Sequence, residues 1–280
     1  MNLHEKTTVL VEALPYINKF KDKIVVVKLG GNAMSEIRHV IEDIVLLSHI
    51  GIKPIVVHGG GPEIDAELKK RNIEPRFVDG LRYTDENVIK MVEKVFKRIN
   101  YAIAKNLNKH GAKSGNAKNC IKARQKDRKL GLVGEVTHVN RIQLLEMLDF
   151  DVIPVVSPIG IGKNGEKFNI NADTAASYVA VALKAEKLTI LTNVDGVIIG
   201  NRILSHIDIR NARKEIKQGN ISKGMIPKVE ACIYAVKNKC PKAHLINGLV
   251  PHSLLLEIFT DKGVGTEIVF KNGYAKSHKA

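Results

Sequence analysis

The sequence holds few of the residues that mark secreted, disulfide-linked or membrane-spanning proteins. It has no tryptophan, only 5% aromatic residues and three cysteines, Cys120, Cys232 and Cys240, among 280 positions. The cysteines are odd in number and lack C-x-x-C spacing, so we expect no disulfide framework, no zinc site and a reducing, cytoplasmic location. No apolar run reaches the roughly 18–20 residues that span a membrane, and the first twenty residues lack signal-peptide features, so no membrane partner is expected.

Acidic residues are scarce relative to basic ones. Lys and Arg number 44 against 29 Asp and Glu, which gives a net charge of +15. Such a field attracts nucleic acids, phosphorylated cofactors and carboxylate substrates alike. The densest basic tract, residues 97–129, has only Phe96 and Tyr101 as nearby aromatics for base stacking. A solvated basic face is therefore favoured over a nucleic-acid groove, and no nucleic-acid partner is expected.

Several motifs of common enzyme classes are also missing. The chain has no G-x-x-x-x-G-K-[ST] sequence, which excludes a P-loop enzyme, and its glycine turns do not match the G-x-G-x-x-G dinucleotide pattern. The segment His58 to Gly61 is similar to a lipase oxyanion strip, but no G-x-S-x-G nucleophile segment accompanies it. No two histidines follow H-x-x-x-H spacing, so a metalloprotease is excluded and no metal-ligating residues are expected.

What the chain does contain is an alternation of strand and helix patterns. Continuous apolar runs predict strands buried on both faces of a parallel sheet, at residues 24–27, 55–57, 152–156, 188–191 and 243–246. An edge strand is expected at 266–270 and a hairpin at 119–139. Amphipathic spacing predicts a long helix from Thr84 as N-cap to Gly111, and others over residues 37–48, 62–71, 173–185, 205–218 and 227–238. This order predicts an α/β fold, a three-layer αβα sandwich with a mainly parallel central sheet.

Residues 1–22 stand apart from this α/β pattern. Leu10, Ala13, Leu14 and Ile17 form an apolar stripe at helical spacing, and Pro15 within it predicts a kinked helix. The stripe needs an apolar surface to cover it, and both its own subunit and a partner subunit remain open as that surface. Elsewhere no linker or repeat is visible, and we place a lobe boundary near residue 184.

Two glycine-rich turns directly follow predicted strands. Gly30-Gly31 comes after the first strand and Gly59 to Gly61 after the second. In an open parallel sheet, ligands bind beyond the carboxyl ends of the strands, where glycine lets the backbone approach an anion. Tight turns also use glycine for steric reasons alone, so each turn by itself is weak evidence. Lys28 strengthens the case, because a lysine ending a buried strand needs an anionic partner.

Two later segments add polar side chains. The alternation through residues 168–173 places Asn169, Asn171 and Asp173 on one face of a strand that runs into a helix. A simple N-cap role would account for Asp173, but not for the two asparagines. Residues 222–228 form a glycine-containing turn before a helix and carry Lys223 and Lys228, for which a solvated loop is the alternative.

With these segments the chain resembles the N-acetylglutamate kinases of the amino-acid kinase family from residue 23 to its end. The motifs that carry the resemblance occur in the family's order at residues 27–31, 57–62, 80–85, 168–173, 192–197 and 224–228. The kinked N-terminal segment around residues 14–17 and the segment 251–261 resemble the arginine-regulated branch. Leu249 departs from that branch, where many relatives have an arginine, and residues 114–119 depart from the family's usual Asp-Gly loop.

The resemblance implies that ATP with Mg²⁺ phosphorylates the γ-carboxylate of N-acetyl-L-glutamate, the second step of arginine biosynthesis. An acceptor one methylene longer, such as N-acetyl-aminoadipate, stays open, because a methylene changes binding by only about 1–3 kcal/mol. By motif, Lys28 and Lys228 would stabilise the transferring phosphoryl group, Asp173 would hold both lysines, and Gly30 and Gly31 would bind phosphate. The resemblance assigns substrate binding to Gly60, Gly61, Arg82, Asn169 and Asn171. Nucleotide binding falls to Asp195, Lys223, Gly224 and Met225.

The same resemblance implies a separate function for each part of the chain and a regulatory site. Residues 1–22 would serve oligomerisation, residues 23–184 acetylglutamate binding and dimerisation, and residues 185–280 ATP binding. A homohexamer built as a trimer of dimers is expected, with arginine as inhibitor. The arginine site would include Tyr16, Glu257 and Gly265.

Overall fold

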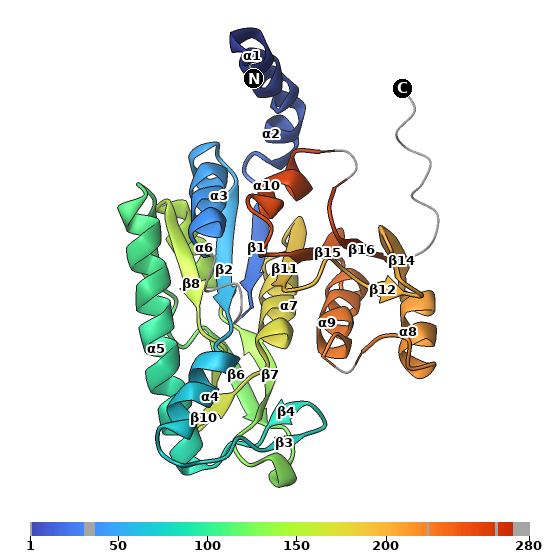
Figure 1. Cartoon of the computed structure of the whole chain (residues 1–280). Helices are drawn as coiled ribbons and strands as arrows, with labels where there is room; N and C mark the ends of the chain where they lie inside the picture. Colours follow the sequence, from blue (N-terminus) through green and yellow to red (C-terminus); the bar gives the residue numbers. More distant parts are fainter. Residues whose placement is uncertain (1, 31–36, 223, 261–262, 271–280) are drawn as a thin grey trace.

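The computed structural model describes residues 2–30, 37–222, 224–260 and 263–270 (Figure 1). Within these residues, an eight-stranded central sheet has the order β14-β16-β15-β11-β1-β2-β8-β5. Neighbouring strands are parallel except for the antiparallel pair β15 and β16. The strands are β1 Ile24–Leu29, β2 Lys53–His58, β5 Lys113–Asn116, β8 Val152–Val156, β11 Lys187–Thr192, β14 His206–Asp208, β15 Lys242–Asn247 and β16 Thr266–Val269. The predicted αβα sandwich with a mainly parallel sheet is confirmed.

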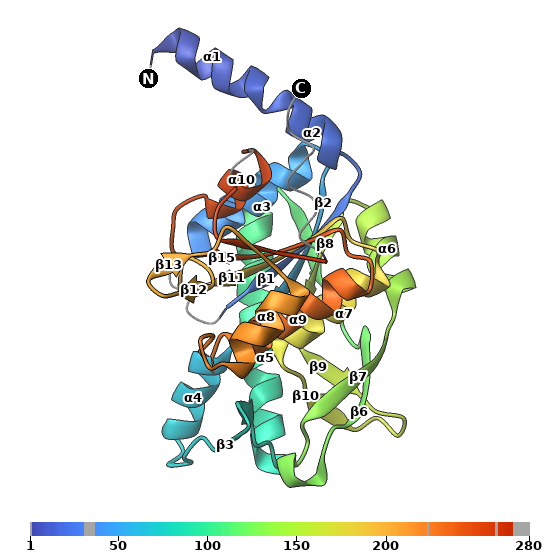
Figure 2. The same cartoon turned by 90° about the vertical axis from the view of Figure 1, so that its right-hand side faces the viewer.

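Helices cover both faces of this sheet, because its inner strands are apolar on both sides. In β1, Val25 and Val27 pack into one hydrophobic cluster and Val26 into another. The first cluster lies under α3 (Ile37–His49), α5 (Glu86–Lys109) and α10 (Ser253–Ile258). The second lies under α6 (Arg141–Asp149), α7 (Ala172–Ala182), α8 (Ile209–Lys217) and α9 (Ile226–Lys237), the latter three in front of the sheet in Figure 2. Each fully buried valine stabilises the fold by roughly 1.5–3 kcal/mol.

A smaller sheet lies beyond the carboxyl ends of the central strands (Figure 1). Its order is β10-β9-β6-β7, and the antiparallel pair β6 and β7 confirms the predicted hairpin. These strands are β6 Ile121–Gln125, β7 Gly134–Val139, β9 Ile159–Ile161 and β10 Lys167–Asn169. The remaining elements are helix α4 (Gly61–Lys69), the short helix η2 (Arg128–Leu130), and the strand pairs β3 Phe77–Val78 with β4 Leu81–Arg82 and β12 Ile198–Ile199 with β13 Arg202–Ile203.

The sheet edges differ from the prediction. The strand expected at the edge, β16, lies between β15 and β14, so that β14 and β5 form the two edges. The predicted helix over 205–218 begins only at Ile209, because His206 to Asp208 pair with β16 and Asp208 caps the helix at Asn211 N. Residues 113–116, interpreted from sequence as the start of a loop, form β5. Edge strands of few residues leave little periodicity to detect.

The long helix α5 begins one residue later than predicted. Asp85, not Thr84, is its N-cap, and the Asp85 carboxylate accepts bonds from the backbone N–H groups of Asn87 and Val88. Thr84 is fully buried and forms an isolated bridge with Gly131. Gly131 permits this contact, because it has a φ of +67° and any Cβ there would meet the Thr84 carbonyl. Tertiary contact thus decides the cap position.

The N-terminal segment is kinked as predicted and projects from the body of the molecule (Figures 1 and 2). Helix α1 (Leu3–Glu12) and helix α2 (Leu14–Phe20) meet at Ala13, just before Pro15, whose missing N–H interrupts the helical bonding. Phe20 is buried, whereas Leu10 and Leu14 of the apolar stripe are exposed. Among the described residues, none of the helices combines the length and apolar character needed to cross a membrane.

Candidate active site

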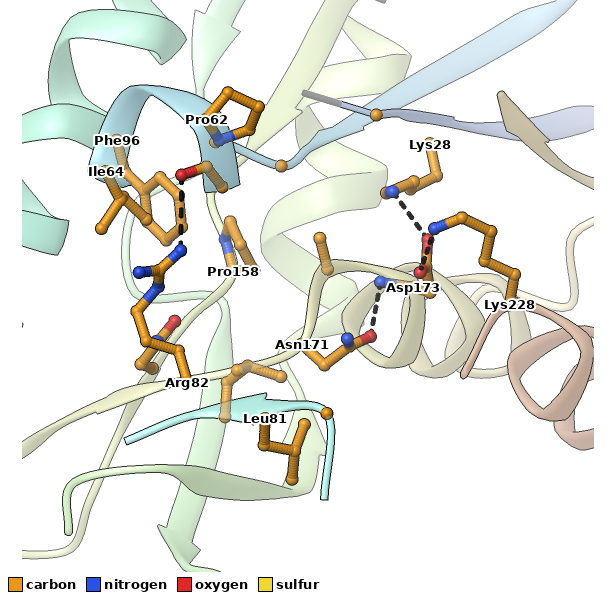
Figure 3. Close-up of a pocket in the computed structure, with 18 of the residues that line it drawn as sticks. Lys28, Pro62, Ile64, Leu81, Arg82, Phe96, Pro158, Asn171, Asp173 and Lys228 are labelled. Atoms are coloured by element: carbon orange, nitrogen blue, oxygen red, sulfur yellow. Dashed lines mark hydrogen bonds and ion pairs between the residues drawn. The ribbon is translucent and has the colours of Figure 1, made fainter. Parts of the chain in front are cut away.

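A cavity of about 400 Å³ opens where β1, β2, β8 and β11 end. Its walls include Gly30 and Gly59 to Gly61 from the two predicted glycine turns. All three residues predicted to be catalytic, Lys28, Asp173 and Lys228, also line it (Figure 3). This is the edge at which parallel sheets bind ligands, since the loops after the strands meet there.

Two lysines converge on one carboxylate at the floor of this cavity (Figure 3). Lys28, near the end of β1, lies with its Nζ 2.7 Å from Asp173 Oδ1. Lys228, in the first turn of α9, lies with its Nζ 3.0 Å from Asp173 Oδ2. The side chains of Lys28 and Asp173 are 5% exposed and that of Lys228 is 22% exposed. The anionic partner that Lys28 requires is therefore Asp173, and the cluster retains one positive charge in excess.

The electrostatic consequence is a carboxylate held ionised. Burial alone would raise the pKa of Asp173, but the two lysine ammonium groups outweigh it and hold that pKa below its usual range. Burial lowers the pKa of Lys28, and the attraction of Asp173 opposes this shift. Removing a partner from such a buried group would leave a charge uncompensated, which is strongly destabilising.

The start of α7 places Asp173, in a way that differs from the prediction. The strand β10 ends at Asn169 and does not continue through Asp173. Asn171 is the N-cap of α7, with its Oδ1 accepting bonds from Asp173 N and Thr174 N, each at 3.0 Å. Asp173 itself lies in the first helical turn, where the helix dipole favours a negative charge. Asn171 therefore acts by fixing the turn that presents the carboxylate.

The glycine turns need glycine for space. A Cβ at Gly60 would lie 2.7 Å from Ile99 and 2.9 Å from Phe96, so a side chain there would displace buried groups. Gly61, the first residue of α4, lines the cavity, and Gly30 lines it too. Backbone N–H groups at the start of a helix can bind an anion, and this helix starts at the cavity wall. Gly31 lies outside the described residues.

A buried histidine supports the second glycine turn. His58 Nδ1 donates to Gly59 O at 2.9 Å, and Ser157 Oγ donates to His58 Nε2 at 2.9 Å. Asn100 Nδ2 in turn donates to Ser157 Oγ at 3.1 Å. Burial lowers the pKa of His58 to about 4, so the imidazole stays neutral. The sequence analysis noted His58 in a lipase-like strip and in the family motif at residues 57–62, but it missed this supporting role, which the buried position at the end of a strand could have indicated.

Arg82 lies at the opposite end of the cavity from the lysines (Figure 3), and Asn169 also lines the cavity. Arg82 forms an ion pair with Asp65 and donates from Nη2 to Gly61 O at 3.4 Å. Its guanidinium lies over the Phe77 ring at 4.8 Å. Asn169 Nδ2 donates to Thr84 Oγ1 at 3.1 Å. The cavity thus has a cationic group at each end, with the lysine pair separated from the arginine.

None of the predicted nucleotide residues that the structure describes, Asp195, Gly224 and Met225, lines this cavity. Thr192 and Asn193 line it, but Asp195 lines a neighbouring cavity of about 220 Å³ and accepts a bond from Asn247 Nδ2 at 2.8 Å. Met225 is buried in the hydrophobic core at the start of α9, directly after Gly224, whose Cβ position faces open space. Lys223 lies outside the described residues.

A second buried charge cluster lies at the amino ends of β11 and β15. Glu257 Oε1 lies 2.6 Å from Lys187 Nζ and 2.9 Å from His244 Nε2. Burial would raise the pKa of Glu257, but His244 and Lys187 lower it to about 2. The three predicted regulatory residues, Tyr16, Glu257 and Gly265, all line one cavity of about 90 Å³ here. Leu249 is not among the described residues that line this cavity.

Comparison with known proteins places this architecture in a family. Residues 23–247 match the Amino acid kinase family. The chain is 47% identical over 279 residues to the acetylglutamate kinase of Caldanaerobacter subterraneus subsp. tengcongensis, covering 94% of this chain and 93% of that protein. It is 45% identical over 280 residues to the acetylglutamate kinase of Desulforamulus reducens, covering 95% and 98%.

Solved structures agree on the fold. An N-acetylglutamate synthase from Neisseria gonorrhoeae, complexed with coenzyme A and N-acetyl-glutamate, superimposes with a TM-score of 0.88 at 25% identity and covers 95% of this chain. This chain spans only 63% of that synthase. The carbamate kinase of Giardia lamblia bound to AMP-PNP has a TM-score of 0.69 at 19% identity, covering 89% of this chain and 99% of that one, and shares the fold.

Proposed function

This chain belongs to the amino acid kinase family, and we propose that it transfers the γ-phosphoryl group of ATP to the side-chain carboxylate of N-acetyl-L-glutamate, the second step of arginine biosynthesis. The observation that carries this proposal is the buried Lys28–Asp173–Lys228 cluster beside two glycine turns. An excess positive charge next to backbone N–H donors fits a site for phosphoryl transfer between two anions.

The reaction needs no general base, because the attacking carboxylate is already ionised at neutral pH. One carboxylate oxygen forms a bond to the γ-phosphorus while the bond from that phosphorus to the bridging oxygen breaks, so that ADP leaves and an acyl phosphate remains. The protein's task is alignment and charge stabilisation. Lys28 and Lys228 would neutralise the γ-phosphoryl oxygens, and Asp173 would hold both ammonium groups in position.

Magnesium would reach this site on the ATP phosphates. Asp173 is the one carboxylate among the described residues that line the cavity, and both of its oxygens already face lysines. The donor set therefore fits a metal ion held by phosphate oxygens and water rather than by protein carboxylates. When bound, the ion would offset negative charge on the phosphates.

Arg82 and Asn169 support an acceptor with a second polar end. The Arg82 guanidinium is suited to bidentate recognition of the substrate's α-carboxylate. That carboxylate would compete with Asp65, the present ion-pair partner of Arg82. With the γ-carboxylate at the lysine end, the acceptor would extend across the cavity. We still propose that the nucleotide is bound by Asp195, Lys223, Gly224 and Met225. The neighbouring cavity at Asp195 supports this proposal, because it offers space for the base of ATP.

A coupled ADP-release assay tests the proposal. Mg-ATP would be combined in turn with N-acetyl-L-glutamate, N-acetyl-aminoadipate and unacetylated glutamate. We expect clear preference for N-acetyl-L-glutamate. Preference for the longer acceptor would assign the chain to a lysine-type pathway, and absence of turnover with all three would contradict the catalytic assignment. Duplex DNA binding with a steep salt dependence would instead favour a nucleic-acid role for the +15 charge.

We also propose that arginine inhibits the enzyme through the cavity at Glu257. That cavity combines ammonium groups at Lys187 and Lys242 with carboxylates at Glu257 and Glu267. Groups of both signs suit a zwitterion that carries an additional cation. The clustering of Tyr16, Glu257 and Gly265 supports the assignment.

The remaining proposals concern organisation. Strands before residue 184 form one half of the central sheet and later strands the other half, which supports an acetylglutamate lobe over 23–184 and an ATP lobe over 185–280. Exposed Val9, Leu10 and Val11 on α1 support burial against a partner subunit and hence a hexamer. The three buried free cysteines are compatible with a cytoplasmic location.

Light scattering on a variant lacking residues 2–12 tests the oligomer. We choose this deletion because Phe20 at the end of α2 is buried in the core and must stay. A fall in mass from hexamer to dimer is expected. An unchanged mass would contradict a role for α1 in assembly.

A further inference from the structure

Two histidines and a glutamate gather outside the cavities described above, where α3 packs against the start of α10. His39 and Glu42 are three residues apart on α3, so their side chains share one helix face, and His252 directly precedes α10. One ligand atom from each of the three lies within 4.8 Å of the others. Both views show α3 and α10 side by side (Figures 1 and 2).

A buried carboxylate orients one of these histidines. His252 Nδ1 donates to Asp43 Oδ1 at 2.6 Å, and the Asp43 side chain is 1% exposed. With the proton on Nδ1, the lone pair of the imidazole lies on Nε2. This carboxylate–histidine arrangement is the usual outer support of a metal-binding histidine. His39 Nδ1 is buried and has no hydrogen-bond partner among the described residues, so its bonding capacity is unused.

We propose that His39, Glu42 and His252 form a site for a divalent transition-metal ion, with Zn²⁺ as the ion that fits best. Two imidazoles and one carboxylate suit zinc, nickel, cobalt or copper rather than magnesium or calcium, which prefer oxygen ligands. Tetrahedral zinc with bonds of about 2.0–2.1 Å places its ligand atoms roughly 3.4 Å apart. His39 Nδ1 and Glu42 Oε2 are 3.6 Å apart, close to that spacing, and all three ligand atoms lie within 4.8 Å of one another.

The three side chains are partly exposed, although His39 Nδ1 itself is buried, and a tetrahedral ion held by three protein ligands would take water as its fourth. The side chains of His39, Glu42 and His252 are 34%, 30% and 45% exposed. One competitor is present, since Glu42 Oε1 accepts a bond from the exposed Arg38 Nε at 2.9 Å. Glu42 Oε2 remains the oxygen that faces His39.

A bound ion would tie α3 to the first residue before α10. Helix α10 carries Ser253, which lines the cavity at Asp195, and Glu257, which lines the cavity at Tyr16. Fixing the start of α10 against α3 would stabilise the position of this helix, which contributes to the walls of both cavities. The ion is separate from the magnesium carried by ATP, and the inference does not depend on the proposed reaction.

Isothermal titration of the full, tag-free chain with ZnCl₂ tests the site. We expect one equivalent to bind to the wild type, with affinity reduced at least about tenfold in His39→Gln and in His252→Gln, and about 10–100-fold in Asp43→Asn. His138→Gln is the matched control, because His138 is exposed on β7 and lies outside the cluster. Visible absorption of bound Co²⁺ would report histidine ligation, and the unfolding temperature should rise with Zn²⁺ in the wild type and the control.

Two results would overturn the proposal. One is the absence of a stoichiometric binding event in the wild type. The other is binding that His39→Gln and His252→Gln leave unchanged. Circular dichroism of each variant would verify that it is folded, and the partly exposed position of His39 makes His39→Gln the variant expected to fold normally.

Discussion

Strand β11 has a buried ion-pair cluster at each end, and the two clusters differ in their balance of charge. At its carboxyl end, one carboxylate, Asp173, faces two lysines beside glycine turns. At its amino end, Glu257 faces Lys187 and His244. Burial and the nearby lysine lower the pKa of His244, so this histidine adds no charge at neutral pH. The first cluster therefore has a surplus cation and the second does not.

The difference indicates which ligand each cluster can accept. A buried surplus cation is costly unless an anion approaches, so the charge of the first cluster suits the phosphate and carboxylate groups of the proposed reaction. The second cluster is already neutral, and additional lysines and Glu267 at its rim offer both signs of charge. A zwitterion can satisfy both signs without leaving a buried charge unpaired. The two sites should therefore respond differently to matched substitutions.

The largest expected effect is at the surplus cation. Lys28→Met should lower kcat by roughly 10²–10³, because a donor that acts on the transferring group stabilises the transition state more than the ground state. KM should change by less than about tenfold. Steady-state kinetics with N-acetyl-L-glutamate measure this, with Lys53→Met on the neighbouring strand β2 as the control. Equal losses in substrate binding and kcat would contradict the role of Lys28.

The next effect concerns the far end of the same cavity. Arg82→Lys keeps the charge but loses the planar fork, so KM for the acceptor should rise about 10–100-fold with a smaller change in kcat. KM for ATP should stay near the wild-type value. If KM for ATP rose as much as KM for the acceptor, Arg82 would not be the group that binds the α-carboxylate.

At the other cluster, Glu257→Gln should leave the uninhibited kcat unchanged and raise the arginine concentration for half-inhibition about 10–100-fold. Loss of one hydrogen bond to a charged group, worth about 1.5–3 kcal/mol, gives this range. Inhibition curves for wild type, Glu257→Gln and Lys28→Met would measure arginine binding separately from catalysis. An unchanged inhibition constant would sink the proposed arginine site.

The Glu257 carboxylate should also make the free energy of unfolding depend on pH in the acid range. The pKa of Glu257 is about 2 in the folded chain against 4.5 for an ordinary glutamate, so the unfolded chain binds the proton first as pH falls. The stabilisation is complete above pH 4.5 and is lost as pH falls from about 4.5 to about 2. By linkage, about 1 kcal/mol should be lost by pH 4 and about 3 kcal/mol below pH 2. Urea midpoints at pH 6 and pH 4 should fall more for the wild type than for Glu257→Gln.

The smallest effect is expected outside both clusters. Leu249 is not among the described residues that line the Glu257 cavity, so Leu249→Arg should change the half-inhibitory arginine concentration by less than about twofold. A larger shift would show that the residue acts on the site from its turn after β15.

Much of the active site was visible in the sequence because its residues lie in short local motifs. Lys28 ends an apolar run and Asp173 follows two asparagines, which marked both as candidates, and the family resemblance then supplied their expected roles. The sequence predicted helix starts less well, because contacts with distant residues determine which of two neighbouring residues caps a helix. Asp85 rather than the predicted Thr84 caps α5. Asn171 caps α7, so the cap role left open for Asp173 falls to its neighbour. Cap positions respond to burial and pairing of neighbouring residues, which periodicity does not contain.

The sequence by itself determined the alternation of strands and helices, the two glycine turns and the identity of the charged groups, since each depends on residues close together in the chain. Only the tertiary structure decided which distant groups meet. It placed Glu257 beside Lys187 and brought His252 to His39 from opposite ends of the chain. The link from Lys28 to Lys228 through Asp173 was implied by the family resemblance, and the structure supplied its geometry. The physical reason is that strand order and helix packing set these distances, and neither follows from local spacing.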